Sequence, residues 1–372
     1  MRKLVTVRQV SDIQPIEGAD FIVLAKVDGW QCIAKKGEFE VGDFALYYEL
    51  DSALPVDDDR YEFLHKSCKK KFAGGEVLRI KTMKMKGELS QGLLLPITSF
   101  PEVQEVIDEY YANDKASEIM DHDFSELLRV VKYEKEVSAP NAAGDFPWFI
   151  RKTDQERIQN QFKRLERDLR DEQPIFVPTL KLDGSSCTLA YVTDPTYKVE
   201  KLQEFEDEDG GQFIVCSRNV LLKPDTENKW YLGADDIGAR EALKQFHENI
   251  GRNIALQGEL VGPGIQGEHE KHHYYTIYAF AIFDIDNQEY LSYSEFAHIC
   301  DFHLRVKRAP QLMEEINILE SFSNVEDYLS FAENIPSEIA FADIPEGVVF
   351  HKKYGKPYSF KAISNQYLMH TD

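Results

Sequence analysis

A lysine on a turn is the first feature of this chain that could do chemistry. Lys181 opens a Lys-Leu-Asp-Gly stretch at residues 181–184, which lies between two apolar runs, residues 175–180 and 187–192. Both runs are rich in strand-forming residues and Asp-Gly favours a turn, so the pattern predicts that Lys181 ends a strand where the chain reverses. A fixed lysine that is partly desolvated, or that lies beside other cations, can lose its proton and act as a nucleophile. By itself the pattern also fits an ordinary hairpin lysine.

Further stretches with charged or aromatic side chains follow this lysine in order. They are Cys216-Ser217-Arg218-Asn219, Gln257 to Gln266 (QGELVGPGIQ), Tyr278 to Ile285 (YAFAIFDI), Glu346 to Phe350 (EGVVF) and Ser359 to Ser364 (SFKAIS). Together they resemble the ordered motifs of the covalent nucleotidyltransferases, the superfamily of polynucleotide ligases and messenger-RNA capping enzymes. The Gly-Glu-Leu followed by Gly-Pro-Gly is similar to RNA ligases of the T4 RNA ligase 2 type. A lone Lys-x-Asp-Gly would be weak evidence, whereas the ordered set is specific.

The resemblance implies an enzyme that uses ATP and Mg²⁺ or Mn²⁺. In that family a lysine attacks the α-phosphate of ATP and expels pyrophosphate, AMP moves to the RNA 5′-phosphate, and a 3′-hydroxyl displaces AMP. Lys181 matches the nucleophile. Asp183 and Glu346 match acids that orient a hydrated divalent metal, for which carboxylates are suitable hard-oxygen partners. Such a metal would lower the pKa of Lys181 by repulsion. Either acid could instead be a turn cap or a sheet-edge charge.

The resemblance also assigns residues to the nucleotide. Glu259 matches an acid that meets the ribose or a metal, and Arg218 matches an arginine that contacts the ribose and the nucleic-acid phosphate, a role suited to its forked donors. Leu180, next to the nucleophile, is placed among the nucleotide-binding residues. Lys361 matches the second lysine of the last motif, which binds the α-phosphate.

One aromatic residue is expected to stack on adenine. Phe283 directly precedes Asp284-Ile285, which is the family position for that ring. Phe280 and Tyr278 are predicted to lie on the other face of the strand, in the core.

The sequence departs from the family at two places. Ser359 stands where the usual pattern, Lys-x-Lys, has its first lysine, and Ser186 replaces an asparagine of the T4 RNA ligase 2 type. Both departures affect how the α-phosphate is neutralised. Nearby lysines could compensate, namely Lys352, Lys353 or Lys356.

The net charge of −22 is unexpected for a protein that binds nucleic acid. Its distribution is uneven, however: residues 66–86 contain eight lysines and arginines and one acid, Glu76. This stretch predicts a basic face that contacts RNA through Lys69, Lys70 and Lys71, although a solvated lysine-rich loop would look the same.

The pattern of elements predicts an α+β protein with two domains. Residues 1–131 contain short strands and tight turns, which favour a small OB-like barrel, with helices over residues 101–113 and 117–132. Residues 132–144 have linker composition. Residues 145–372 mix strands and helices, which favours an antiparallel-sheet nucleotidyltransferase (ATP-grasp-like ligase) domain, entered by a capping box at Thr153-Asp154-Gln155-Glu156 that starts a helix.

An N-terminal barrel followed by the nucleotidyltransferase domain resembles the RNA ligase 5 group, the Deinococcus and Naegleria type. The resemblance implies a nicked duplex with RNA on the 3′-hydroxyl side as substrate. A DNA-sealing ligase, a capping-type guanylyltransferase and a non-catalytic RNA-binding protein remain as alternatives.

No apolar run approaches a membrane span, and the five cysteines are scattered and odd in number. We therefore expect a monomeric intracellular protein with reduced thiols, in the cytoplasm or the nucleus.

Overall fold

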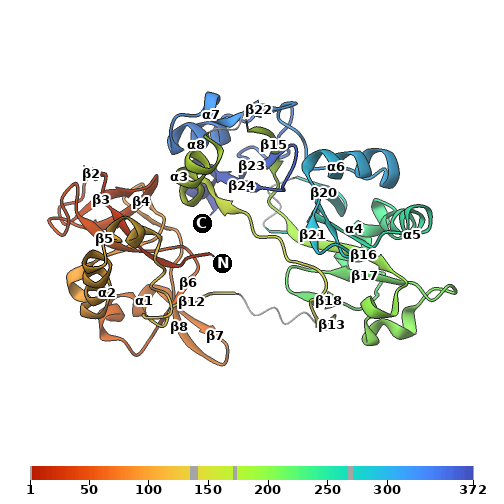
Figure 1. Ribbon diagram of the computed structural model, residues 1–372, viewed down its shortest axis with the longest axis horizontal. Helices are drawn as coiled ribbons and strands as arrows, with labels where there is room; N and C mark the ends of the chain where they lie inside the picture. Colours follow the sequence, from red (N-terminus) through yellow and green to blue (C-terminus); the bar gives the residue numbers. More distant parts are fainter. Residues whose placement is uncertain (1, 135–140, 171–173, 267–270, 372) are drawn as a thin grey trace. The chain divides into compact units, whose positions relative to one another are not determined.

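The computed structural model describes residues 2–134, 141–170, 174–266 and 271–371. The chain forms two compact units, a first unit of residues 1–136 with 368–372 and a second unit of residues 137–367. Figure 1 shows their elements, coloured along the chain. Across the described residues, no helix has both the length and the apolar character needed to cross a membrane.

The first unit is built from short antiparallel strands around one core. Its sheets have the orders β1 (Val5–Gln9), β5 (Phe44–Tyr48), β11 (Leu93–Pro96); β2 (Asp12–Pro15), β3 (Ile22–Val27), β4 (Trp30–Lys35); β12 (Val131–Lys132), β6 (Ser52–Pro55), β8 (Gly75–Arg79), β7 (Lys69–Phe72); and β9 (Met83–Met85), β10 (Glu88–Ser90). The β3–β4 turn has Asp28 and Gly29 at positive φ, as a two-residue hairpin requires. Trp30, Tyr47 and Tyr48 are fully buried in the core. The predicted small barrel is confirmed.

Short helices complete the first unit. They are η1 (Asp59–Leu64), α1 (His65–Cys68), η2 (Ile97–Ser99), α2 (Pro101–Ala112) and η3 (Ala116–Asp121). The helix expected over residues 117–132 is wrong. Asp123 accepts a hydrogen bond from the Ser125 backbone, and Arg129 adopts a φ of +55°, so the chain turns and then extends into β12. Local side-chain hydrogen bonds of this kind compete with a helix.

The second unit contains two sheets, here called the large sheet and the small sheet. The large sheet has the order β13 (Ala142–Asp145), β18 (Val220–Leu222), β17 (Gln212–Cys216), β16 (Ser185–Val192), β19 (Ile254–Val261), β20 (Thr276–Asp284), β21 (Glu289–Tyr290). The small sheet has the order β14 (Glu156–Arg157), β24 (Ser359–Ile363), β23 (Gly347–Lys352), β15 (Ile175–Lys181), β22 (Ile316–Asn317). Pairing is antiparallel except between β14 and β24. The α+β prediction is confirmed.

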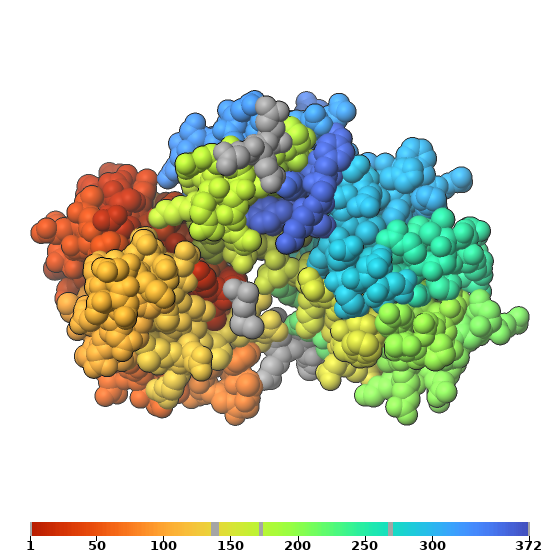
Figure 2. All heavy atoms as spheres, viewed as in Figure 1, coloured from red at the N-terminus to blue at the C-terminus, as the bar shows by residue number. Residues whose placement is uncertain are grey.

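Helices cover both sheets of the second unit. The large sheet carries α4 (Lys229–Asp236), α5 (Ala239–Ile250), α6 (Tyr293–His298) and the π-helix η6 (Ile299–Leu304), whose apolar residues share one core with it. The small sheet packs on α3 (Ile158–Leu169) and α8 (Val325–Glu333), around Phe350 and Phe360. Figure 2 shows α3, in yellow-green, beside the blue C-terminal strands. The remaining helices are η4 (Pro195–Tyr197), η5 (Glu200–Phe205), α7 (Ile318–Ser321) and α9 (Asn365–Thr371).

The entry into the second unit differs from the expectation. Residues 142–144, expected to be linker, belong to β13, and the capping box at residues 153–156 does not form. Glu156 and Arg157 are instead a strand beside β24, and α3 begins at Ile158 without a side-chain cap. Pairing with a buried sheet outweighed the local capping signal.

Gly347 stands where β23 meets β24, and only glycine fits there. Its φ is +153°, and a Cβ would lie 2.1 Å from the carbonyl oxygen of Ala362. Gly347→Ala should therefore lower the free energy of unfolding of the second unit by roughly 2 to 4 kcal/mol, from backbone strain and from separation of the strands. Denaturant titration followed by circular dichroism would measure this.

Gly355→Ala is the matched control. Gly355 also has a positive φ, +71°, but a Cβ would meet nothing within 4 Å. It should cost only about 1 kcal/mol. Equal losses in the two variants would contradict a steric role for Gly347.

Candidate active site

The turn that carries Lys181 joins the two sheets of the second unit. β15 ends at Lys181 in the small sheet, and β16 begins at Ser185 in the large sheet. The strand end was predicted correctly, but the hairpin reversal is wrong, because β15 pairs with β23 whereas β16 pairs with β19. The turn lies against β19, where a Cβ on Gly184 would come within 2.4 Å of the Leu260 carbonyl oxygen. Glycine is what lets the turn approach this strand.

Lys181 forms an ion pair with Glu346. The Lys181 Nζ donates to Glu346 Oε2 at 2.6 Å, with side chains that are 22% and 15% exposed. The register explains the contact: Lys181 lies opposite Gly347 in the β15–β23 pair, and Glu346 is the residue just before that glycine. Two residues far apart in sequence are thus neighbours across one strand pair.

Two more carboxylates complete the surroundings of Lys181. Glu259 lies on β19 opposite Ser186, and its carboxylate accepts a hydrogen bond from the Gly184 backbone. Asp183, within the turn, accepts a hydrogen bond from the Tyr367 hydroxyl, with 2.6 Å between Tyr367 Oη and Asp183 Oδ2. The structure therefore brings together three of the predicted acids around the predicted nucleophile.

The charges of this cluster are strongly coupled. Burial by itself lowers the pKa of Lys181, but the attraction of Glu346, Glu259 and Asp183 outweighs it, and the net pKa lies above that of an ordinary lysine. Burial raises the pKa of Glu259 to about 7, against the opposing effect of Lys181. In this state Lys181 is an ammonium. The negative charge of the neighbouring carboxylates must be neutralised before Lys181 can lose its proton and act as a nucleophile.

The acids fit a hydrated divalent cation. Among the described residues, no group of three His, Cys, Asp or Glu side chains is arranged to ligate an ion directly. Asp183 and Glu346 nevertheless supply hard-oxygen donors and excess negative charge, and Mg²⁺ characteristically keeps several of its waters. These two carboxylates are suited to hold such a cation through its water.

Lys361 and Arg157 provide the cationic side of the site. Lys361 lies on β24, opposite Val349 of β23 and beside Arg157 of the parallel strand β14. Burial, together with repulsion from Lys181 and Arg157, lowers the pKa of Lys361 to about 7. The negative charge of a bound phosphate would favour the protonated form of Lys361 and raise its pKa again. The pair is therefore suited to bind an anion, and Arg157 is a cation that the sequence analysis did not assign to the site.

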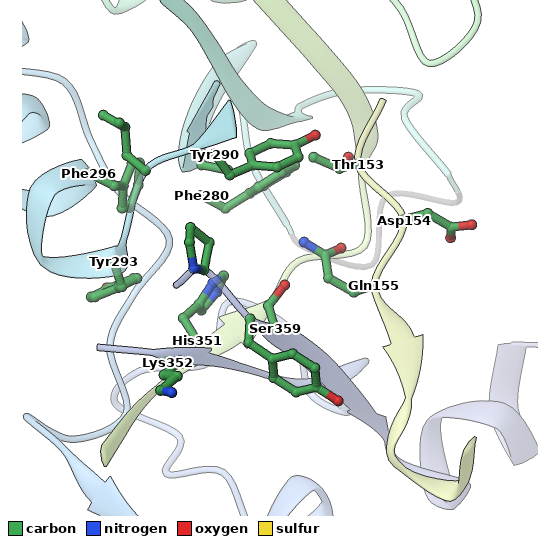
Figure 3. Close-up of a pocket in the computed structure, with 14 residues that line it drawn as sticks. Thr153, Asp154, Gln155, Phe280, Tyr290, Tyr293, Phe296, His351, Lys352 and Ser359 are labelled. Atoms are coloured by element: carbon green, nitrogen blue, oxygen red, sulfur yellow. The ribbon is translucent and has the colours of Figure 1, made fainter. Parts of the chain in front are cut away.

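A cavity of about 140 Å³ opens between β20 of the large sheet and β23 and β24 of the small sheet. Figure 3 shows Phe280, Tyr290 and Tyr293 around it, with His351 and Ser359 at its floor. His351 accepts or donates a hydrogen bond with Thr179 at 3.1 Å between Nε2 and Oγ1, and burial lowers its pKa to about 4. The cavity thus has aromatic walls and a polar floor, with Asp154 and Lys352 also on its lining, and this combination suits a planar heterocycle.

Phe280 lines this cavity, whereas Phe283 does not. Phe283 is fully buried in the core of the large sheet against Tyr290, so its predicted stacking on adenine is wrong. The reason is a β-bulge: Gln257 pairs with Ala281 but Gly258 pairs with Ala279, so Phe280 is an extra residue. A bulge shifts the alternation of side chains, which turns Phe280 toward the cavity. Alternating sequence patterns contain no signal for this shift.

The other predicted site residues are a buried leucine, an exposed arginine of the second unit and three exposed lysines of the first unit. The Leu180 side chain is 2% exposed in an apolar cluster with Leu182 and Val261, so it is not available to a nucleotide. Arg218 is exposed in the turn between β17 and β18. Lys69, Lys70 and Lys71 are exposed on β7 of the first unit, where Lys69 pairs with Glu76 at 2.7 Å.

The low pKa of Lys361 has a consequence for stability. The unfolded chain holds a proton on this lysine up to its ordinary pKa of 10.5, whereas the folded chain releases it near 7. Between these values the unfolded state binds more protons, so folding becomes more favourable as pH rises, by up to about 1.4 kcal/mol per pH unit. Lys361→Met should remove this gain between pH 7 and 9, as measured by denaturant unfolding without nucleotide.

Lys356→Met serves as the control, because Lys356 is an exposed lysine in the turn between β23 and β24. Its pH dependence should follow the wild type. Parallel curves for wild type and Lys361→Met would contradict a lowered pKa of Lys361.

Comparisons with known proteins agree with this geometry. A family model described as RNA ligase matches residues 174–363, and one described as an OB-fold domain matches residues 4–97. No curated protein sequence matches the chain. Among solved structures, the Naegleria gruberi RNA ligase with PPi is 36% identical, with a TM-score of 0.74, covering 99% of this chain and 98% of that chain.

Structures of two variants of that enzyme are similar to this chain to the same degree. One, with ATP and Mn, is 36% identical with a TM-score of 0.74 and covers 100% of both chains. Another, with AMP and Mn, is 35% identical with a TM-score of 0.75 and covers 99% of this chain and 98% of that chain. The family match, the near-complete coverage and the clustered Lys181, Glu259, Glu346 and Lys361 lead to one conclusion: this chain is a member of the RNA ligase family with an N-terminal OB-fold domain.

Proposed function

We propose that this RNA ligase uses ATP to join 3′-hydroxyl and 5′-phosphate ends of RNA, through a lysyl-AMP intermediate on Lys181 and an adenylylated 5′ end. The observation that carries the proposal is the ion pair of Lys181 with Glu346 inside a cluster of three carboxylates, next to a low-pKa Lys361. The relatives whose structures contain ATP or AMP with Mn support the choice of nucleotide and metal.

In the first step, Lys181 Nζ attacks the α-phosphorus, a P–N bond forms, and the bond to pyrophosphate breaks. Glu346 holds Nζ in place and is the hydrogen-bond acceptor nearest to its proton. Lys361, with Arg157 beside it, gains a proton and offsets the charge of the α-phosphate. A bound Mg²⁺ or Mn²⁺, held through water by Asp183 and Glu346, would neutralise carboxylate charge and so allow Lys181 to be deprotonated.

The adenine is placed in the cavity beside Phe280. This ring lies on the cavity wall opposite the strand that carries His351, and it has the flat apolar face that a purine needs. Glu259, which lies beside the turn that carries Lys181, is proposed to contact the ribose or the metal. Arg218, exposed at the edge of the large sheet, is proposed to contact the RNA phosphate.

The proposed substrate is a nick in a duplex with RNA on the 3′-hydroxyl side. The exposed lysines of β7, Lys69, Lys70 and Lys71, are proposed to contact its phosphates, because they form a local basic strand on an acidic protein. Double-stranded RNA is recognised mainly through 2′-hydroxyls and A-form shape, which fits a requirement for RNA on one side of the nick.

The experiment that tests the first step is incubation of the protein with α-labelled ATP or GTP and Mn²⁺. We expect an acid-labile labelled adduct from ATP, reduced at least about a thousandfold in Lys181→Met, because the nucleophile is gone. An adduct from GTP alone would indicate a guanylyltransferase. The absence of any wild-type adduct would overturn the proposal in favour of an RNA-binding protein.

The strand preference needs its own measurement with the same preparation. Nicked duplexes with RNA or DNA on each side of the nick should be sealed only when the 3′-hydroxyl strand is RNA. Equal sealing of an all-DNA nick would contradict the proposed substrate while leaving the adenylylation step intact.

The place of adenine is tested by Phe280→Ala. Loss of the stacking ring should raise the ATP concentration for half-maximal adduct formation roughly tenfold or more. Phe280→Tyr should restore most of the affinity. Phe283→Leu is the control: it should lower the thermal stability of the protein but leave the ATP dependence close to wild type. The opposite pattern would return Phe283 to the nucleotide.

A further inference from the structure

The segment that follows β24 contacts the backbone of Glu346 and the carboxylate of Asp183, the two residues assigned to the hydrated cation. The Ser364 backbone N–H donates to the Glu346 carbonyl oxygen at 2.9 Å. The Ser364 hydroxyl oxygen accepts a hydrogen bond at 3.1 Å from the backbone N–H of Tyr367, which fixes the first turn of α9. The Tyr367 hydroxyl then donates to Asp183 Oδ2 at 2.6 Å. A short run of residues thus connects the strand end at Glu346 with the side chain at Asp183.

Asp183 is the acid in this cluster whose position depends most on its surroundings. Glu346 directly precedes β23 and its carbonyl oxygen accepts from the Ser364 N–H, and Glu259 lies within β19, whereas Asp183 lies in the turn between the two sheets. A turn residue lacks the hydrogen bonds of a strand ladder, so its carboxylate needs a side-chain contact to set its direction. The phenol hydroxyl supplies such a contact on Oδ2, and a carboxylate has a second oxygen that can accept from water.

We propose that Tyr367 is a positioning residue that orients the Asp183 carboxylate toward the hydrated cation; this inference rests on the function proposed above. Tyr367 does not contact the reacting atoms. It acts through Asp183, and Ser364 holds it in place through the first turn of α9. Removal of such an outer contact typically costs 10- to 100-fold in metal affinity in metalloproteins.

A purely structural role is the competing explanation. Tyr367 and Asp183 are both partly buried, so the hydrogen bond could serve only to attach α9 to the turn. In that case Tyr367→Phe would lower the unfolding temperature and leave the metal requirement unchanged. The two roles therefore differ in a measurable quantity, the affinity for Mn²⁺.

The experiment uses the full-length Lys181→Met protein with saturating AMP, in which no lysyl adduct can form. Binding of Mn²⁺ is measured from the electron paramagnetic resonance signal of free Mn²⁺, and the Mn²⁺-dependent rise in unfolding temperature is measured beside it. We expect Tyr367→Phe in this background to weaken Mn²⁺ binding 10- to 100-fold, with AMP binding in the absence of metal unchanged.

Two controls make the result specific. Tyr354→Phe removes the hydroxyl of a tyrosine that is 57% exposed and should bind Mn²⁺ as its parent does. Asp183→Asn should weaken Mn²⁺ binding by itself, and adding Tyr367→Phe to it should cause little further loss, because residues that act through one another are not additive. If Tyr367→Phe folds poorly, Ser364→Ala, which loosens the first turn of α9, should show a smaller shift in the same direction.

Unchanged Mn²⁺ binding in a folded Tyr367→Phe protein would overturn the proposal, as would full additivity with Asp183→Asn. Failure of the parent protein to bind Mn²⁺ with AMP would also overturn it. Because this background forms no adduct, these outcomes are separate from the labelled-ATP test, in which loss of the wild-type adduct would refute the ligase function itself.

Discussion

The ion pair between Lys181 and Glu346 is the interaction on which the rest of the site depends. It sets the position of Lys181, the proposed nucleophile, and favours its protonated form. The contact exists because β15 and β23 pair in one register, with Lys181 opposite Gly347. A slip of one residue would turn Lys181 to the other face of the sheet. The proposed chemistry at Lys181 therefore depends on a strand register that is supported by the core around Phe350 and Phe360.

The same turn connects the two sheets, and this explains why the site draws on both. Lys181, Glu346 and Lys361 come from the small sheet, whereas Glu259 and Phe280 come from the large sheet. Close approach is made possible by glycines, at Gly184 against β19 and at Gly347 against β24. The groups drawn together in this way are largely removed from water, and burial raises the pKa of Glu259 and lowers that of Lys361.

The departure at Ser359 is understandable from this arrangement. Ser359, which stands at the position of the first lysine of the Lys-x-Lys motif, lines the cavity. Of the lysines considered as substitutes, Lys353 forms an ion pair with Glu315 and Lys356 is exposed, while Lys352 lies along the cavity. Arg157 is brought beside Lys361 by the parallel β14–β24 pairing, and it supplies a second positive charge that the last motif lacks in sequence.

The sequence by itself determined the family and the barrel followed by an α+β domain, and it predicted Lys181, Asp183, Glu259, Glu346 and Lys361 as candidate site residues. These follow from local signals: alternating apolar residues, Asp-Gly turns, and motifs whose chemistry requires particular side chains in order. Only the tertiary structure decided that Glu156 and Arg157 form a strand instead of the start of a capped helix, that Phe280 lines the cavity instead of Phe283, and that Arg157 and Tyr367 lie beside the predicted site residues. The physical reason is common to all of them. A parallel edge pairing, a β-bulge and a hydrogen bond between distant segments depend on partners far away in the chain, and no local pattern of residues records them.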